Sequence, residues 1–257
     1  ETGTNTQLHA DKILDGTKKL GLPYSESAET IANFDLDITN LPTNDNGVYT
    51  TAPITITYYY KRQDAGNVVA KYLEDTTNTV LATEETQNGA GKLGLPYTTV
   101  AKTVANYELT ANPANATGTF ITTEQTVTYV YRRADAGDVT VYHKSVYDNS
   151  DLSTPTVLDG SRKLGLAYST SMATIPDYEI FSLPANANGV YTTSSQNVTY
   201  VYKRKDGGEV KAVYVDEAGV ELANAENISG VENAGLPYTT TAKTRSEEHT
   251  SELQSRT

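Results

Sequence analysis

The feature that most constrains the fold is a tyrosine-rich segment that recurs along the chain at a constant spacing. Residues 126–133 read TVTYVYRR, and related segments occupy residues 57–62 (TYYYKR) and 199–204 (TYVYKR). Tyr58, Tyr129 and Tyr200 in these segments are each separated by 71 residues. A fixed period of this length is typical of an array of small modules rather than of one large domain.

Within each copy the residue types alternate in a way that predicts a β-strand. Successive side chains of a strand point to opposite faces, so Val127, Tyr129 and Tyr131 share one face of the central copy. We expect this face to lie in the core and the alternate face, which carries Thr126 and Thr128, to lie toward water. The equivalent core-facing residues of the other copies are Ile56, Tyr58 and Tyr60, and Val198, Tyr200 and Tyr202.

The composition fits small modules whose cores are rich in tyrosine. Only 37% of the 257 residues are hydrophobic, and the chain has 19 tyrosines but 3 phenylalanines and no tryptophan. A tyrosine ring can be buried while its hydroxyl stays wet, which suits a thin module. A module of about 70 residues buries only roughly 60% of its unfolded surface, so each is expected to be marginally stable alone.

Charge and cysteine content exclude several classes of function. The chain has no cysteine, so it has neither a disulfide nor a thiolate metal site nor a thiol nucleophile. Its formal net charge of −12 argues against nucleic acid and anionic membranes as partners. No apolar run approaches the length of a membrane-spanning helix. The chain has no signal peptide and does not begin with methionine, so we interpret it as part of a longer protein.

The repeat divides the sequence into four modules. We expect a module truncated at its N-terminus at residues 1–62, complete modules at 66–133 and 137–204, and a module truncated at its C-terminus at 208–244. Short linkers with Asp and Gly separate them, at Asp64, Asp135 and Asp206. Residues 94–103 and 235–244 agree at nine of ten positions, which indicates that pairs of modules were duplicated.

Residues 245–257 do not continue the repeat. Their sequence begins RSEEHTSELQS and resembles the conceptual translation of a sequencing-library adapter. We interpret the segment as an assembly artefact and exclude it from the fold. The alternative is a short natural helix, because Glu, Leu and Gln favour helix.

Apart from this tail, the sequence predicts a mainly β chain. Thr, Val and Tyr dominate, and Gly, Pro and Asn punctuate the extended segments. The best place for a short helix is residues 98–104 (TTVAKTV), although three threonines and two valines weaken that prediction.

Motifs that carry chemistry are better explained as structure. Gly89, Gly91 and Gly94 spell the dinucleotide-binding pattern G-x-G-x-x-G, but Leu95-Pro96 follows at once and disfavours the helix that such a site needs. The segment beginning at Leu41-Pro42 lacks the rest of a wall-sorting signal and is interpreted as a turn.

Catalytic and metal-binding sets are absent from the sequence pattern. The three histidines, His9, His143 and His249, do not form a triad or a zinc motif. The carboxylate pairs Asp35/Asp37 and Glu84/Glu85 are not repeated and are interpreted as solvated charge. Calcium at the linker aspartates and a Lys71–Asn crosslink between strands are weaker alternatives. We predict no enzyme activity, no cofactor, no catalytic residue and no metal ligand, and the sequence leaves the ligand-binding residues unknown.

The order of motifs resembles the mucin-binding (MucBP) repeat of Gram-positive surface adhesins. These motifs are V-x-x-x-Y, G-x-P-Y-T-T, N-Y-E-L, G-T-F or G-V-Y, and T-V-T-Y-V-Y-R-R, and they recur in order in both complete modules. Ala167 departs from the pattern where proline is expected before tyrosine. The resemblance implies β-grasp-like modules in an elongated rod, anchored to the wall of a bacterium and exposed outside the cell.

The same resemblance implies adhesion to mucus glycoproteins through multivalent weak binding. The alternative is a non-binding stalk that projects a distal adhesive domain. Glycan binding predicts a repeated, outward-facing patch of Tyr, Asn or Asp, whereas a stalk predicts that mainly core and linker positions repeat. The expected partners are host mucins and neighbouring modules of the same chain.

Overall fold

A computed structural model describes residues 1–244, which fold as two compact units. The first spans Glu1–Ala134 and the second begins at Asp135. The described residues contain eighteen strands and no helix. The prediction for residues 245–257 lies outside the described residues.

The strands of the first unit are β1 (Pro23–Ser25), β2 (Phe34–Leu36), β3 (Asn46–Val48), β4 (Tyr60–Arg62), β5 (Val68–Glu74), β6 (Val80–Gln87), β7 (Pro96–Thr98), β8 (Tyr107–Ala111), β9 (Thr117–Thr119) and β10 (Gln125–Arg133). Those of the second unit are β11 (Val139–Ser145), β12 (Thr156–Leu158), β13 (Ala167–Ser169), β14 (Tyr178–Ser182), β15 (Asn188–Val190), β16 (Gln196–Arg204), β17 (Val210–Val215) and β18 (Glu221–Ile228).

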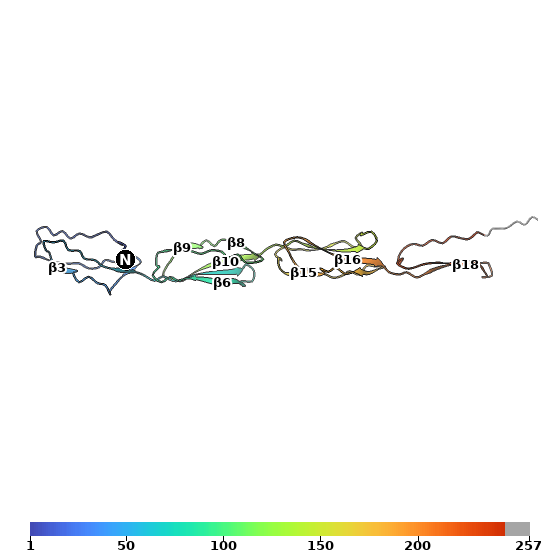
Figure 1. Ribbon diagram of the computed structural model, residues 1–257, viewed down its shortest axis with the longest axis horizontal. Helices are drawn as coiled ribbons and strands as arrows, with labels where there is room; N and C mark the ends of the chain where they lie inside the picture. Colours follow the sequence, from blue (N-terminus) through green and yellow to red (C-terminus); the bar gives the residue numbers. More distant parts are fainter. Residues whose placement is uncertain (245–257) are drawn as a thin grey trace, which may run out of the picture. The chain divides into compact units, whose positions relative to one another are not determined.

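The second module is built on a mixed sheet with the order β6-β5-β10-β8 (Figure 1). The opening strand β5 and the closing strand β10 lie parallel at its centre, with Tyr129 opposite Tyr72. The outer strands β6 and β8 pair antiparallel with them. This order with a parallel central pair is that of a β-grasp sheet. The third module repeats it as β12-β11-β16-β14.

The tyrosine-rich segment has the predicted orientation. Val127, Tyr129 and Tyr131 of β10 are almost completely buried, with Tyr129 only 1% exposed, while Thr126 is exposed and Thr128 is half-buried. The ring of Tyr129 stacks on that of Tyr72, and both belong to one core cluster with Val68 and Ala70. A mainly β chain of small tandem modules with tyrosine-rich cores is therefore confirmed.

The helix predicted for residues 98–104 is wrong. The segment after β7 runs as irregular chain without helical hydrogen bonds. Its backbone is held by a side chain of β10 instead, because the Tyr131 hydroxyl accepts from Lys102 N at 2.9 Å and donates to Lys102 O at 2.8 Å. Tyr202 binds Ala173 N and O in the same way in the third module. A buried hydroxyl thus takes the place of helical pairing.

The two end modules have fewer strands. In the first module β1 pairs with β3, and β2 pairs with β4. In the fourth, β17 and β18 form an antiparallel hairpin, and no other described strand joins them. A screen of residues 1–244 finds no helix that is long and apolar enough to span a membrane.

Candidate functional site

A set of hydrogen bonds recurs at the boundaries between consecutive modules. In the first unit, Gly91 N donates to the Asp64 carboxylate at 2.7 Å. Leu93 N donates to Gln63 O at 3.1 Å, and the Arg62 guanidinium donates to Leu93 O at 3.1 Å. The linker is therefore fixed to the loop that precedes β7 of the second module. We call this set of contacts the joint.

The second unit contains the same joint between the third and fourth modules. Glu232 N donates to the Asp206 carboxylate at 2.9 Å, and Ala234 N donates to Lys205 O at 3.1 Å. The Arg204 guanidinium donates to Ala234 O at 3.3 Å. Because the atoms and distances recur, the joint is a feature of the repeat and not of one pair of modules.

Close backbone approach adds a steric element to the joint. Gly94 has a φ of +79° and faces Asn33, which has a φ of +66°. A Cβ atom at Gly94 would lie 2.6 Å from Asn33 Nδ2, and one at Gly235 would lie 2.6 Å from Asp177 Oδ2. A Cβ atom at either position would strain the left-handed backbone and displace the end of the facing side chain, so glycine is favoured at this position of the G-x-P-Y motif.

The last arginine of each of the first three modules packs on an aromatic ring of its own module. The guanidinium carbon of Arg62 lies 4.3 Å from the Phe34 ring centre, and that of Arg204 lies 4.9 Å from the Tyr178 ring centre. Arg133 has the same relation to Tyr107 at 4.6 Å. A stacked guanidinium loses little freedom on forming its hydrogen bonds, so the ring holds each arginine in position.

The linker aspartates are used by the chain itself. Asp64, Asp135 and Asp206 each accept a backbone N–H from the loop of the following module, with Arg162 N donating to Asp135 at 2.9 Å. Within residues 1–244 the structure contains no group of three or more His, Asp or Glu residues arranged to hold a metal ion. The geometry thus gives the carboxylates a structural role, as anchors of left-handed turns.

The sequence interpretation of Asp37 as solvated charge is wrong. Asp37 is only 3% exposed and forms an ion pair with Lys61 at 3.0 Å. Hydrogen bonds from Thr39, followed by the pair with Lys61, lower the pKa of its carboxyl to about 2. Asp35 is exposed as expected and accepts from Gln63 Nε2 at 2.7 Å. The signal that was missed is Thr39, two residues after Asp37, the pattern of an Asx turn.

Glu85 belongs to a cluster that occurs in alternate modules. Its carboxylate pairs with Lys102 at 2.9 Å and accepts from the Tyr72 hydroxyl, while Lys102 Nζ lies 4.6 Å from the Tyr72 ring centre. Burial, and then the negative charge of Glu85, raise the pKa of Tyr72 to about 12. Tyr214, Glu226 and Lys243 form the same cluster in the fourth module.

The two described histidines each have a partner in their own module. His143 takes the place of Tyr72 in the third module, where its ring is stacked on Tyr200 with centroids 5.5 Å apart. His9 lies 3.8 Å from Glu29 in the first module, and His249 is outside the described residues. The glycines Gly89, Gly91 and Gly94 lie in turns that lead to β7, without a helix.

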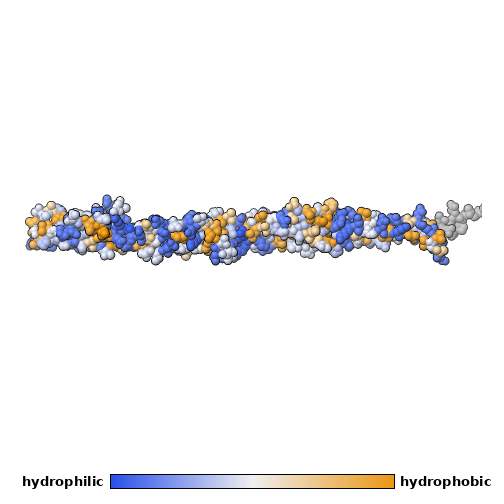
Figure 2. All heavy atoms as spheres, turned by 90° about the horizontal axis from the view of Figure 1, so that it is seen from below, coloured by the Kyte–Doolittle hydropathy of each residue, from blue (hydrophilic) through white to orange (hydrophobic). Residues whose placement is uncertain are grey.

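The exposed tyrosines of the outer surface do not repeat, although the leucine that precedes the Pro-Tyr or Ala-Tyr pair is exposed in every module (Leu22, Leu95, Leu166 and Leu236). Among described tyrosines only Tyr147 and Tyr238 are largely exposed, and they occupy different positions in their modules. On the face shown in Figure 2, apolar side chains lie in small groups among polar ones. Tyr147 also donates to Glu232 at 2.9 Å, next to the joint of the second unit. Contacts in the core and at the joints thus recur, whereas exposed tyrosines do not.

Comparison with known families identifies the repeat. The model of the MucBP domain matches residues 1–61, 67–132, 138–203 and 209–251. Together these ranges cover nearly the whole chain, and the two complete modules, 67–132 and 138–203, each contain one copy of the motif order described above.

Two named relatives carry similar sequences. Internalin J of Listeria monocytogenes serovar 1/2a is 38% identical over 92% of this chain and 27% of its own length. Internalin I of the same strain is 25% identical over 90% of this chain and 12% of its own length. The chain therefore spans about a quarter or less of these relatives. The family and these relatives support a surface, adhesion-type repeat region of a Gram-positive bacterium.

Two solved structures are also similar. Domains 3–4 of a streptococcal cell-surface protein with SHIRT repeats give a TM-score of 0.30 and 11% identity, covering 53% of this chain and 96% of that one. The structure of Mub-RV gives a TM-score of 0.21 and 13% identity, covering 53% of this chain and 97% of that one.

Proposed function

The chain belongs to the MucBP domain family, and on that basis we propose that it forms part of a surface adhesin that binds mucus glycoproteins weakly through many modules. The observation that carries the proposal is the fourfold repetition of one family module in a single chain. When several weak binding sites are linked, their combined affinity far exceeds the affinity of one site. The formal net charge of the chain, −12, favours binding to uncharged glycan segments over binding to sialylated or sulfated ones, because like charges repel.

The joints support this role by presenting modules at a defined spacing. Two modules linked by a carboxylate, an arginine and a glycine contact cannot reorient as freely as two modules on a flexible linker. A defined spacing raises the effective concentration of the second site when it matches the spacing of the ligand. We propose that the protein lies outside the cell, at the bacterial surface.

A non-binding stalk is the second candidate. The observation that favours it is the pattern of repetition, since core and joint contacts recur while exposed tyrosines do not. In this account the modules only hold a distal domain away from the cell, and no enzymatic step is assigned to them.

Retention on mucin separates the two candidates. The full chain is displayed in many copies on beads and passed over surfaces coated with intact or chemically deglycosylated mucin. Adhesion predicts retention on intact mucin that soluble mucin competes away and that deglycosylation reduces. A stalk predicts that the beads pass both surfaces as freely as beads that carry an unrelated acidic protein.

A further inference from the structure

A histidine lies in the core of the third module, which is complete. His143 is at the centre of β11, opposite Tyr200 of the parallel strand β16. It is only 6% exposed and points to the same face of the strand as the buried Val141 and Ser145. Histidine is the side chain that ordinarily changes its charge between pH 5 and pH 8. A buried imidazole in a structural core therefore couples the fold of this module to pH.

The imidazole ring is held mainly by aromatic contacts. It is stacked on the Tyr200 ring, with centroids 5.5 Å apart and planes inclined by 12°, and the Tyr202 ring centre lies 5.8 Å away. Nδ1 of His143 lies 3.3 Å from Ser153 Oγ. Nε2 is buried and has no hydrogen-bond partner among the described residues. The neutral ring fits this environment, because a neutral imidazole needs only one donor N–H.

The second module places a different residue in the same position. Tyr72 stacks on Tyr129 with the same centroid distance of 5.5 Å. Its hydroxyl donates to the carboxylate of Glu85, which in turn pairs with Lys102 at 2.9 Å. The polar end of this side chain thus reaches a charged pair at the edge of the core.

The third module lacks both members of that charged pair. Thr156 lies opposite Val141 in the strand register, where the second module has Glu85 opposite Ala70. The position of Lys102 is taken by Ala173, whose backbone binds the Tyr202 hydroxyl. No carboxylate therefore stands at this position to balance a positive charge on the His143 ring.

The other titratable groups around the ring do not supply that balance. Those in the core are phenols: Tyr168 of β13, Tyr178 of β14, Tyr191, and Tyr200 and Tyr202 of β16. Phenols are neutral near pH 7, and burial raises the pKa of Tyr202 further. Lys144, the next residue of β11, lies on the opposite face of the strand and pairs with Asp151 at 3.0 Å. A protonated ring would thus bury an unpaired charge and an N–H donor without an acceptor, which is costly.

We propose that His143 makes the third module an acid-sensitive element of the array, which opens as the pH falls below about 6.5 while the second module stays closed. In the open module the imidazole meets water, and a histidine in an unfolded chain takes up a proton near this pH. The open form therefore binds more protons than the closed form. By linkage, the stability of the module is complete above about pH 7 and declines as the pH falls below 6.5.

The expected consequence is local. The strands β11 and β16 form the central parallel pair of the third module, so its core opens when they separate. The second module has no histidine among residues 66–133 and keeps its stacked tyrosines. Acid thus loosens one module of the array, and this effect does not depend on whether the modules bind mucin.

Hydrogen exchange of the full chain at a series of pH values from 7.5 to 5.0 tests the proposal. The amides of β11 and β16 are compared with the equivalent amides of β5 and β10 in the same molecule, after correction for the intrinsic exchange rate at each pH. We expect the opening constant of the third module to rise by up to about tenfold for each pH unit below 6.5. That of the second module should change little.

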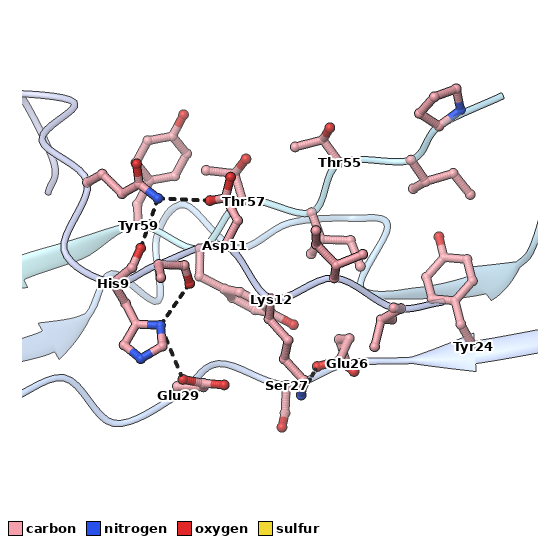
Figure 3. Close-up of a pocket in the computed structure, with 18 of the residues that line it drawn as sticks. His9, Asp11, Lys12, Tyr24, Glu26, Ser27, Glu29, Thr55, Thr57 and Tyr59 are labelled. Atoms are coloured by element: carbon pink, nitrogen blue, oxygen red, sulfur yellow. Dashed lines mark hydrogen bonds and ion pairs between the residues drawn. The ribbon is translucent and has the colours of Figure 1, made fainter. Parts of the chain in front are cut away.

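Two variants remove the proton site and keep a ring in place. His143→Tyr introduces the residue of the second module, and His143→Phe has no polar group to satisfy. Both should abolish the extra acid sensitivity of the third module. The matched control is His9→Gln, because His9 is an exposed histidine that lies 3.8 Å from Glu29 in the first module (Figure 3). This variant should leave the acid response of the third module unchanged.

The unmodified chain already supplies a decisive comparison, which does not depend on how either variant folds. An equal response of the second and third modules to acid would overturn the proposal. Acid sensitivity of the third module that persists in His143→Tyr or His143→Phe would also overturn it, because the proton would then bind elsewhere.

Discussion

The ring of Tyr72 lies parallel to the ring of Tyr129, with ring centroids 5.5 Å apart and planes inclined by 11°. The two residues sit opposite each other on the parallel strands that open and close the module. This pair therefore ties together two segments that lie far apart in sequence. The Tyr129 hydroxyl continues the link to Thr99 at 2.9 Å, so one residue joins both ends of the module to its middle.

Replacement of Tyr129 by alanine should severely destabilise the second module. Loss of a large buried aromatic side chain costs about 3–5 kcal/mol in free energy of unfolding, a large share of the stability of a domain this small. Thr128→Ala, on the half-buried opposite face of the same strand, is the control and should change the melting temperature much less. Thermal melts followed by circular dichroism compare the two, and a larger effect of Thr128→Ala would reverse the assignment of the faces.

Gly94→Ala should weaken the joint of the first unit. The left-handed conformation costs any L-residue roughly 1–2 kcal/mol, and the new Cβ would also meet Asn33 Nδ2 at 2.6 Å. Gly91→Ala is the matched control, since Gly91 has a φ of +63° but open space around its Cβ position. Hydrogen exchange of the Leu93 amide, which donates to Gln63 O, measures the joint directly. If the Leu93 amide exchanged at the same rate in the two variants, the predicted effect of the steric contact at Gly94 would be contradicted.

The stability of the first module should fall at acid pH because of Asp37. Its pKa in the folded protein is about 2, below the ordinary value of 3.8, so the contribution to stability is complete above about pH 4. It is lost as the pH falls toward 2, when the carboxyl is protonated in both states. The stability difference between the protein and Asp37→Asn should shrink over this range in melts at successive pH values. Asp35→Asn, the neighbouring exposed carboxylate, should show a much smaller dependence.

At alkaline pH the second module should lose stability through Tyr72. Its folded pKa is about 12 against an ordinary value of 10, so folding favours the neutral phenol. The contribution is present below pH 10 and is lost as the pH rises through 12. Nuclear magnetic resonance of tyrosine ring carbons can follow this titration. Glu85→Gln should lower the Tyr72 pKa only in part, because burial is the larger cause; an unchanged value would contradict the cluster.

Local sequence patterns predicted the strands well, but they did not predict the contacts between residues that are distant in sequence. The alternation of residue types in Thr126–Arg133 indicates which side chains are buried, so the core face of this strand could be predicted from the sequence. The joint could not be predicted, because Asp64 and Gly91 lie 27 residues apart in sequence and no local pattern links them. The helix predicted at residues 98–104 failed for the same reason, since the Tyr131 hydroxyl that holds Lys102 comes from a distant strand. Tertiary contacts of this kind override the local helix propensity of a segment.

The candidate site was predictable only in outline. The spacing of Asp64, Asp135 and Asp206 indicated that the linkers repeat, but not that each carboxylate binds a backbone amide of the following module. Similarly, the sequence alone indicates that Glu85 is a surface charge, whereas the structure shows that it pairs with Lys102 and accepts from the Tyr72 hydroxyl. Charged residues carry no periodic signal of their partners, so their roles emerge only from the folded chain.

The most direct test of the account is the retention of beads on intact mucin as a function of the number of chains per bead. If the modules bind weakly and act together, retention should be near background at low density and rise steeply once several chains can engage at once. Soluble mucin should shift this rise to higher density. Retention that stays at background at every density would contradict mucin adhesion by these modules and leave the stalk as their role.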